Sequence, residues 1–197
     1  MTIAAEKQAL RKELLARRRS LSAEERAAMT RALTAQVLAL PAYRDARRIM
    51  TYLSLPGEAD LDEVIRAALG QGKEVYVPVC LADHAMEAGR LVDMDHFIPG
   101  PYGLRDLPKG YETAAPETMD LVLVPAVACD EMGRRLGHGA GYYDRYLSRV
   151  DGSRRLAVLW DFQIVPEVPA DDLDLPMGGF VTEKRVHVCA GGRGVKC

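Results

Sequence analysis

The segments LVLVP (Leu121–Pro125) and RRLGHGAGYYD (Arg134–Asp144) decide the fold of this 197-residue chain. The run of apolar residues before the proline is typical of a strand that is buried on both faces of a parallel sheet. The second segment has glycine at every second position, at Gly137, Gly139 and Gly141, and continues into a helical sequence. A buried strand, a glycine-rich loop and a helix in this order predict an α/β unit with its ligand site at the carboxyl end of the strand.

The glycine-rich loop has the composition of a phosphate-binding site. Its glycines leave backbone amides without neighbouring side chains, so a polyanion can approach them closely. Arg134 and Arg135 enter the loop and Asp144 follows it, which adds cations for phosphate oxygens and a carboxylate suited to magnesium. The loop lacks both the Gly-Lys-Ser/Thr ending of a P-loop and the G-x-G-x-x-G spacing of a dinucleotide site. Composition alone leaves two interpretations open, a ligand loop and an ordinary strand-to-helix turn.

The overall composition limits the class of protein. With 48% hydrophobic and 27% charged residues, the chain is an ordinary globular protein, and its length is suitable for one domain. A net charge of −2 predicts no general attraction for nucleic acid or for a membrane surface. The cysteines show no C-x-x-C spacing, the histidines show no metal-binding spacing, and no apolar run is long enough to span a membrane. We therefore expect a cytoplasmic protein with reduced thiols. We also expect a monomer that acts on small-molecule substrates.

Hydrophobic periodicity predicts helices that alternate with short strands. Helices are expected at residues 5–19, 23–40, 60–69 and 141–149, with capping boxes at Ser22/Glu25 and Asp60/Glu63. Strands are expected at residues 49–55, 74–80, 121–124 and 156–159, and residues 81–116 are expected to form short strands and loops over the sheet edge. The run Arg17–Arg19 is expected to be a solvated helix end.

This order of elements predicts a fold of the α/β class. We expect a single three-layer α/β/α domain with a mostly parallel central sheet. The domain is expected to span residues 1–197, with its core at about 5–189 and a disordered tail at 190–197.

The run LVLVPAVACDEMGRRLGHGAGYYDRYL resembles the strand and glycine loop of the 5-formyltetrahydrofolate cyclo-ligases, also called methenyltetrahydrofolate synthetases. Five more segments resemble elements of this family in chain order: KQALRK, YLSLPGEADL, YGLRDL, WDFQIVPEVP and FVTEKRV. The resemblance extends from about Lys7 to Val188, which is nearly the whole chain. It implies a single α/β domain, in agreement with the pattern of helices and strands.

The resemblance also implies an ATP- and Mg²⁺-dependent ligase that converts 5-formyltetrahydrofolate to 5,10-methenyltetrahydrofolate and releases ADP and phosphate. In this chemistry ATP phosphorylates the formyl oxygen, N10 of the folate attacks the activated carbon, and phosphate departs. The protein then needs to position two substrates and to neutralise charge, and it needs no nucleophile of its own.

Site residues follow from the positions that match the family. The resemblance implies that the ATP site comprises two residues of the first helix and the glycine loop: Lys7, Arg11, Arg135, Leu136, Gly137, His138, Gly139, Ala140, Gly141, Tyr142 and Tyr143. Glu58 is expected to accept hydrogen bonds from the pterin, between Leu53 and Tyr102 as apolar walls. Arg135, Lys7 and Asp144 are expected to act in catalysis, and Asp144 also as a magnesium ligand.

Departures from the family pattern keep other functions open. His138 and Ala140 are unusual in the loop, and Gly178 stands where the family has an aspartate implicated in magnesium binding. Asp174, Asp161 or water would have to take the place of that aspartate. Two alternatives therefore remain: a folate- or nucleotide-binding relative without turnover, and a sugar-phosphate isomerase or acyl-transfer enzyme of similar architecture.

Overall fold

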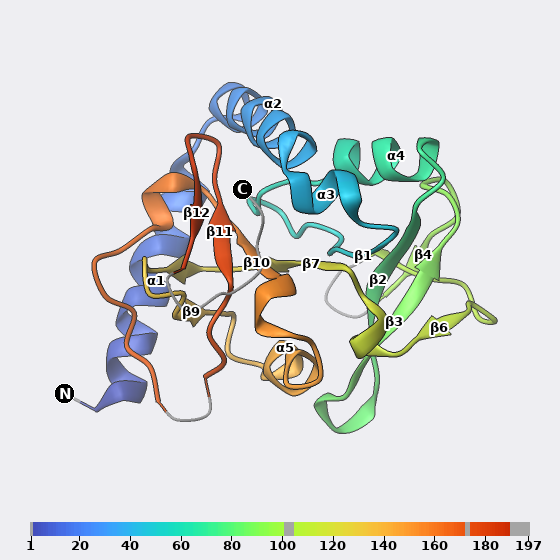
Figure 1. Ribbon diagram of the computed structural model, residues 1–197. Helices are drawn as coiled ribbons and strands as arrows, with labels where there is room; N and C mark the ends of the chain where they lie inside the picture. Colours follow the sequence, from blue (N-terminus) through green and yellow to red (C-terminus); the bar gives the residue numbers. More distant parts are fainter. Residues whose placement is uncertain (1, 101–104, 172–173, 190–197) are drawn as a thin grey trace.

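The structure is a computed structural model that describes residues 2–100, 105–171 and 174–189 (Figure 1). The expectations for Tyr102 and for a tail at residues 190–197 lie outside the described residues. The main sheet contains β1 (Arg48–Met50), β2 (Glu74–Cys80), β3 (Met86–Leu91), β6 (Thr113–Ala114), β7 (Leu121–Pro125), β10 (Arg155–Val158), β11 (Gly179–Val181) and β12 (Val186–Val188). Two small hairpins pair β4 (Ile98–Pro99) with β5 (Arg105–Asp106), and β8 (Ala128–Cys129) with β9 (Arg135–Leu136).

The strand order of the main sheet is β12-β11-β10-β7-β1-β2-β3-β6. The consecutive strands from β11 to β2 in this order pair in parallel, and antiparallel strands flank them at both edges. The expected α/β class with a mostly parallel central sheet is therefore confirmed. The strand that the sequence singled out, β7, lies near the middle of this sheet.

Helices cover both faces of the sheet (Figure 1). The helices are α1 (Ile3–Ser20), α2 (Ala23–Ala39), α3 (Pro41–Asp45), α4 (Asp62–Gly70) and α5 (Tyr142–Leu147). In Figure 1, α2, α3 and α4 lie above the sheet and α5 lies below it. Short 3₁₀ turns occur at Ala82–His84, Pro116–Thr118, Gly152–Arg154 and Asp161–Gln163. In the described part of the chain, no helix has the length and apolar character needed to cross a membrane.

Alternation along β7 explains why the strand is apolar throughout. Leu121 and Leu123 pack into the cluster beneath α2, α3 and α4, whereas Val122 and Val124 pack into the cluster beneath α5. Successive side chains of a strand point to opposite faces, so a strand with helices on both sides needs apolar residues at every position.

The first helix, α1, contacts the β8–β9 hairpin instead of a face of the main sheet. Leu14 of α1 belongs to a small separate cluster of buried residues. Its other members are Val127, Ala128 of β8, Leu136 of β9 and Val168. This contact brings the amino-terminal residues of the chain beside the glycine-rich loop, which follows β9 directly.

Three sequence predictions need correction. Strand β1 ends at Met50, although the apolar run continues to Leu55. Helix α4 begins at Asp62 without a capping box, because Asp60 accepts a hydrogen bond from the Asp62 amide in a local turn instead. Residues 81–116 contain the expected short strands, but β3 pairs antiparallel with β2 along six positions, so it extends the sheet instead of lying over its edge. The capping box at Ser22 and Glu25 is confirmed, with bonds of 3.1 and 2.7 Å.

A buried carboxylate fixes the turn that precedes the glycine-rich loop. Asp130, which is fully buried, accepts hydrogen bonds from the backbone amides of Met132 and Arg134 and, across the chain, from the amide of Val168. The Nε atom of Arg134 donates a further bond of 2.6 Å. The turn between β8 and β9 is thus held by charge-assisted bonds at its centre.

We expect Asp130→Ala to lower the free energy of unfolding by about 3 kcal/mol, because the Arg134 cation and three amides lose their buried acceptor. Urea denaturation of the purified variant measures this change. Glu117→Ala, which removes the exposed ion pair with Arg149, is the control and should cost less than about 1 kcal/mol. Equal losses in the two variants would contradict the role given to Asp130.

Candidate functional site

A cavity of about 480 Å³ lies at the carboxyl ends of the adjacent strands β7, β1 and β2. Pro125 ends β7, Tyr52 and Leu53 follow β1, and Pro78 and Cys80 belong to the end of β2. Ligands of open parallel sheets bind at this edge. Another wall is the glycine-rich loop with the start of α5, and it contributes Arg135, Gly137, His138, Gly139, Ala140, Gly141, Tyr142, Tyr143 and Asp144.

Each glycine of the loop has its own structural reason. Gly139 and Gly141 have φ values of +98° and +76°, in the left-handed region where a Cβ is unfavourable. A Cβ on Gly137 would lie 2.8 Å from Nη1 of Arg135, so this position is glycine because a guanidinium passes close to it. The exposed Ala140 lies between the two left-handed residues. The loop therefore has a defined backbone conformation, with two left-handed glycines and the Arg135 side chain packed against Gly137.

Arg135 is the cation at the centre of this wall. Its side chain is only 5% exposed, and it donates to the Pro125 carbonyl at 3.1 Å and to Oδ1 of Asp144 at 2.9 Å. Its guanidinium also lies 5.7 Å from the ring centroid of Tyr143. One cation therefore ties the end of β7 to the first turn of α5.

Two buried donors at this wall have no partner among the described residues. They are Nε of Arg135 and the hydroxyl of Tyr143. Burial raises the pKa of Tyr143, so the phenol is neutral and can donate a hydrogen bond. Buried polar groups in proteins are normally satisfied, so these two donors call for an acceptor that the described residues do not supply.

The two residues expected from the first helix differ in their contacts. Arg11 donates from Nε to the Gly137 carbonyl at 2.8 Å, so it supports the glycine-rich loop from outside the cavity. Lys7 binds Asp171 and Asp174 at 2.8 and 2.5 Å. Partial burial lowers the pKa of Lys7, but the hydrogen bonds to the two aspartates outweigh it, and the pKa is raised overall. The structure thus brings Arg11 to the loop and holds Lys7 on an acidic pair.

Glu58 also lines the cavity, with its side chain 6% exposed. Its Oε2 accepts a bond from the Leu55 amide at 2.9 Å, and its Oε1 lies 2.9 Å from Nε2 of His138. Nη2 of Arg18 approaches the same Oε1 at 3.7 Å. The sequence placed His138 near phosphate, whereas the structure places it on the carboxylate expected to bind the pterin.

Arg18 lies beside the candidate site, and the sequence analysis missed it. The expectation of a solvated run is wrong at this position, because the side chain is 4% exposed and its Nε donates to the Gly57 carbonyl at 3.1 Å. The available signal was helical spacing: Arg11, Leu14 and Arg18 share one face of α1, which packs toward the site. This spacing was overlooked because Arg18 lies between two other arginines, and the run was interpreted as a whole.

Leu136 and Leu53 also differ in position. The side chain of Leu136 is buried with Leu14 beneath the loop, so it supports the loop and does not line the cavity. Leu53 is nearly buried and does line the cavity, as expected for an apolar wall. Tyr52, also in this wall, was not foreseen; its hydroxyl donates to the Ala59 carbonyl at 2.7 Å.

The residues suggested for magnesium contact different partners and do not form one group. Gly178 takes part in backbone pairing with Arg155 and Cys189, and Asp161 accepts hydrogen bonds from Thr182 and Arg185. Across residues 2–100, 105–171 and 174–189, no three His, Cys, Asp or Glu side chains form a metal cluster. Asp144 is 39% exposed and bonds Arg135 through one oxygen. This donor set fits magnesium only where phosphate oxygens and water supply most of its ligands.

Comparison with known proteins identifies relatives over nearly the whole chain. A sequence model described as the 5-formyltetrahydrofolate cyclo-ligase family matches residues 3–183. The 5-formyltetrahydrofolate cyclo-ligase of Mus musculus is 31% identical, and the alignment covers 93% of this chain and 96% of that protein. The protein of the same name from Escherichia coli K12 is 30% identical, with 86% and 96% covered.

Solved structures agree with this result. The 5,10-methenyltetrahydrofolate synthetase of Aquifex aeolicus superposes with a TM-score of 0.83 and 33% identity, covering 97% of this chain and 96% of that one. A 5,10-methenyltetrahydrofolate synthetase from Mycoplasma pneumoniae has the same fold, with a TM-score of 0.73, 22% identity and coverage of 90% and 98%.

We expect Gly137→Ala to weaken nucleotide binding about tenfold or more, because the added methyl group displaces the guanidinium of Arg135 from Asp144. Calorimetric titration with a non-hydrolysable ATP analogue measures the dissociation constant. Gly152→Ala is the matched control, since no atom lies within 4 Å of its added Cβ. Unchanged affinity in Gly137→Ala would show that the loop tolerates a displaced Arg135.

Proposed function

Because the chain belongs to the 5-formyltetrahydrofolate cyclo-ligase family, we propose that it closes 5-formyltetrahydrofolate to 5,10-methenyltetrahydrofolate with ATP as co-substrate. One observation carries the proposal: a single cavity has Glu58 in one wall, and Arg135 with the glycine-rich loop in the other. A pterin and a triphosphate need these two kinds of wall, and the reaction needs both ligands side by side.

The triphosphate binds along the glycine-rich loop in this proposal. We assign the bare amides of the loop, Nε of Arg135 and the hydroxyl of Tyr143 as the donors to the anionic oxygens of the triphosphate. Arg11 holds the loop through the Gly137 carbonyl, and Lys7 reaches the nucleotide by exchanging one aspartate partner for a phosphate oxygen.

The pterin binds against Glu58, whose carboxylate accepts hydrogen bonds from the exocyclic amine and the adjacent ring nitrogen. The Leu55 amide and the Arg18 guanidinium keep this carboxylate in place. Leu53, Leu55 and Met86 supply apolar surface around it. The formyl group of a pterin in this position faces the glycine-rich loop across the same cavity.

The chemistry then consists of two displacements. The formyl oxygen takes the γ-phosphoryl group of ATP, and ADP leaves. N10 attacks the formyl carbon and loses its proton, the carbon–oxygen bond breaks, and phosphate departs with the former formyl oxygen. Arg135 offsets the negative charge that develops on the transferred group, and the loop amides orient it. Magnesium held by Asp144 and the phosphates supplies further charge neutralisation when bound.

No covalent protein intermediate enters this scheme. Cys80 is the thiol in the cavity wall, and desolvation, together with the charge of Asp106, raises its pKa. The thiol is therefore protonated near neutral pH and is a weak nucleophile. Catalysis in this site rests on positioning and electrostatics.

Formation of the methenyl chromophore tests the proposal directly. Purified protein is mixed with 5-formyltetrahydrofolate, and the absorbance is followed with and without ATP and magnesium. Product that depends on ATP supports the cyclo-ligase. Folate binding without product would favour the non-catalytic relative, for which Gly178 is the observation, and activity without ATP would favour an isomerase or acyl-transfer enzyme.

We expect Arg135→Ala and Asp144→Asn each to lower kcat about 100-fold or more, because each removes a charge that acts on the transferred phosphoryl group. Steady-state rates and thermal unfolding are measured together, so that loss of fold is separated from loss of chemistry. Arg149→Ala is the control, since this arginine pairs with Glu117 at the surface. Near-normal rates in both site variants would contradict the catalytic roles given to Arg135 and Asp144.

We expect His138→Ala to tighten the binding of 5-formyltetrahydrofolate by about threefold to tenfold, because His138 no longer competes with the pterin for Oε1 of Glu58. Leu55 and Arg18 still hold the carboxylate in the variant. Equilibrium titration with the folate in the absence of ATP is the measurement. Weaker folate binding would mean that His138 positions the Glu58 carboxylate for the pterin and does not compete with the pterin for it.

A further inference from the structure

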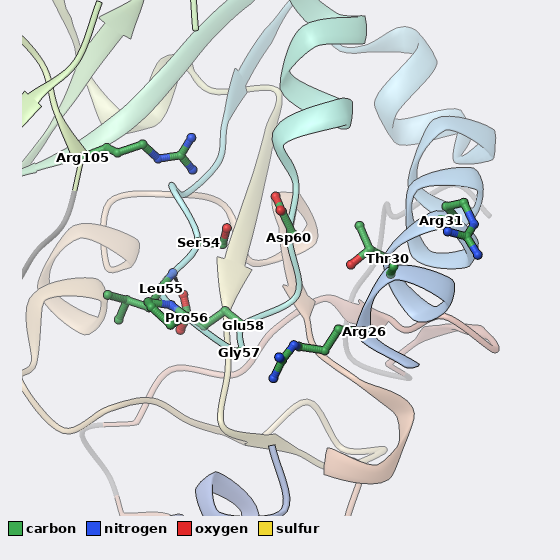
Figure 2. Close-up of a pocket in the computed structure, with 11 residues that line it drawn as sticks. Arg26, Thr30, Arg31, Ser54, Leu55, Pro56, Gly57, Glu58, Asp60 and Arg105 are labelled. Carbon is green, nitrogen blue, oxygen red and sulfur yellow. Dashed lines mark hydrogen bonds between the residues drawn. The ribbon is translucent and has the colours of Figure 1, made fainter. Parts of the chain in front are cut away.

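Two segments line the candidate site where the proposed function places the folate, and different side chains anchor them. The first segment is the turn after β1 that contains Leu55, Gly57 and Glu58, and it also lines a neighbouring cavity of about 690 Å³ (Figure 2). The Gly57 carbonyl accepts hydrogen bonds from the buried side chains of Arg18 and Trp160. The second segment is the β2–β3 hairpin, and a donor from α5 reaches its tip.

The tip of this hairpin, residues 81–85, contains an unusual backbone conformation. Asp83 has φ +56° and ψ +33°, and no other residue except glycine has a positive φ in the described part of the chain. The Leu81 amide donates to the Ala85 carbonyl at 2.8 Å, and the Ala85 amide donates to the Ala82 carbonyl at 3.1 Å, so the turn closes around Asp83. Aspartate adopts the left-handed region more readily than most residues, but its Cβ still makes this conformation unfavourable. A contact from outside the hairpin therefore stabilises the tip.

Arg145 of α5 supplies this contact. Its Nη1 atom donates to the Asp83 carbonyl at 2.6 Å, and the tip of the hairpin lies beside α5 in Figure 1. Near the base of the hairpin, Met86 packs against the apolar cluster that contains Tyr146 and Leu147 of α5. Helix α5 thus holds the base of the hairpin through apolar packing and its tip through a charged donor, which makes a stronger hydrogen bond than a neutral one.

The position of the hairpin decides part of the shape of the candidate site. Cys80, Leu81 and Met86 line its cavity, and Leu81 is 42% exposed although it is large and apolar. Apolar side chains form most of the lining of small-molecule sites. Arg145 itself is not one of the described residues that line this cavity. It can therefore reach a ligand there only through the hairpin.

We infer that Arg145 is a positioning residue of the candidate site, which holds the β2–β3 hairpin where Leu81 and Met86 form an apolar wall. The inference rests on the proposed function and adds to it a residue that contacts neither substrate. Arg145 directly follows Asp144, so one turn of α5 serves the phosphates through one side chain and the hairpin through the next. The effect of Arg145 should therefore fall on folate binding and not on nucleotide binding.

An attraction of the Arg145 charge for anionic substrates is the alternative explanation. Arg145 is exposed, so salt screens this attraction strongly. The attraction would also act on ATP, which carries more negative charge than the folate. A short bond to one backbone carbonyl favours the positioning role, and the two explanations differ in which ligand they affect.

The test measures two dissociation constants by calorimetric titration, one for 5-formyltetrahydrofolate and one for a non-hydrolysable ATP analogue. In Arg145→Ala we expect the Kd of the folate to rise about fivefold to tenfold and that of the analogue to stay within about twofold. Arg145→Lys keeps a charged donor for the carbonyl, so its Kd for the folate should stay within about threefold of wild type. Arg149→Ala is the control and should alter neither Kd, because Arg149 pairs with Glu117 at the surface.

A second variant displaces the tip while Arg145 is kept. Proline cannot adopt the φ of Asp83, so Asp83→Pro moves the carbonyl away from the guanidinium. We expect it to raise the Kd of the folate as Arg145→Ala does, and the double variant to raise it no further than the larger single change. Thermal unfolding shows whether the variants keep the native fold.

Three results overturn the inference: no rise in the Kd of the folate in Arg145→Ala, an equal rise for both ligands, or effects of Arg145→Ala and Asp83→Pro that multiply in the double variant. The methenyl assay separates the inference from the proposed function. A selective loss of folate binding without ATP-dependent product in wild type keeps the role of Arg145 and removes the enzyme activity. Product formation with an unchanged KM for the folate in Arg145→Ala keeps the activity and removes the role.

Discussion

The buried guanidinium of Arg135 is the constraint on which the candidate site depends. A cation with 5% exposure is stable only when acceptors surround it, and the acceptors here are the end of β7 and the first turn of α5. A Cβ on Gly137 would lie 2.8 Å from Nη1 of Arg135, so a larger residue there would displace this guanidinium. The position of one charge thereby sets the path of the backbone that faces the cavity.

A second set of contacts connects the two sides of the molecule. The turn at Gly57 accepts hydrogen bonds from Arg18 of α1 and from Trp160, which follows β10. Glu58 comes next and contacts His138 of the glycine-rich loop. The expected pterin ligand is thus tied to the first helix, to the sheet and to the loop.

Much of the fold could be predicted from sequence because its signals are local. Four apolar residues in β7 required cover on both faces, and Ser22 with Glu25 marked the start of α2 correctly. The errors occurred where partners distant in sequence decided the outcome. Strand β3 exists because β2 offers a free edge, and Asp60 begins a turn before α4 instead of capping it. The periodicity of a single segment predicts neither the pairing of β3 with β2 nor the turn at Asp60.

The sequence by itself determined the α/β class, the strand-loop-helix unit and the residue types of the glycine-rich loop, since these depend on spacing along the chain. Only the tertiary structure decided how those residues meet. It buried Arg18 beside Glu58, paired His138 with that carboxylate and held Lys7 between two aspartates. The reason is that a charge takes its role from the groups that surround it in space, and packing brings those groups together from distant parts of the chain.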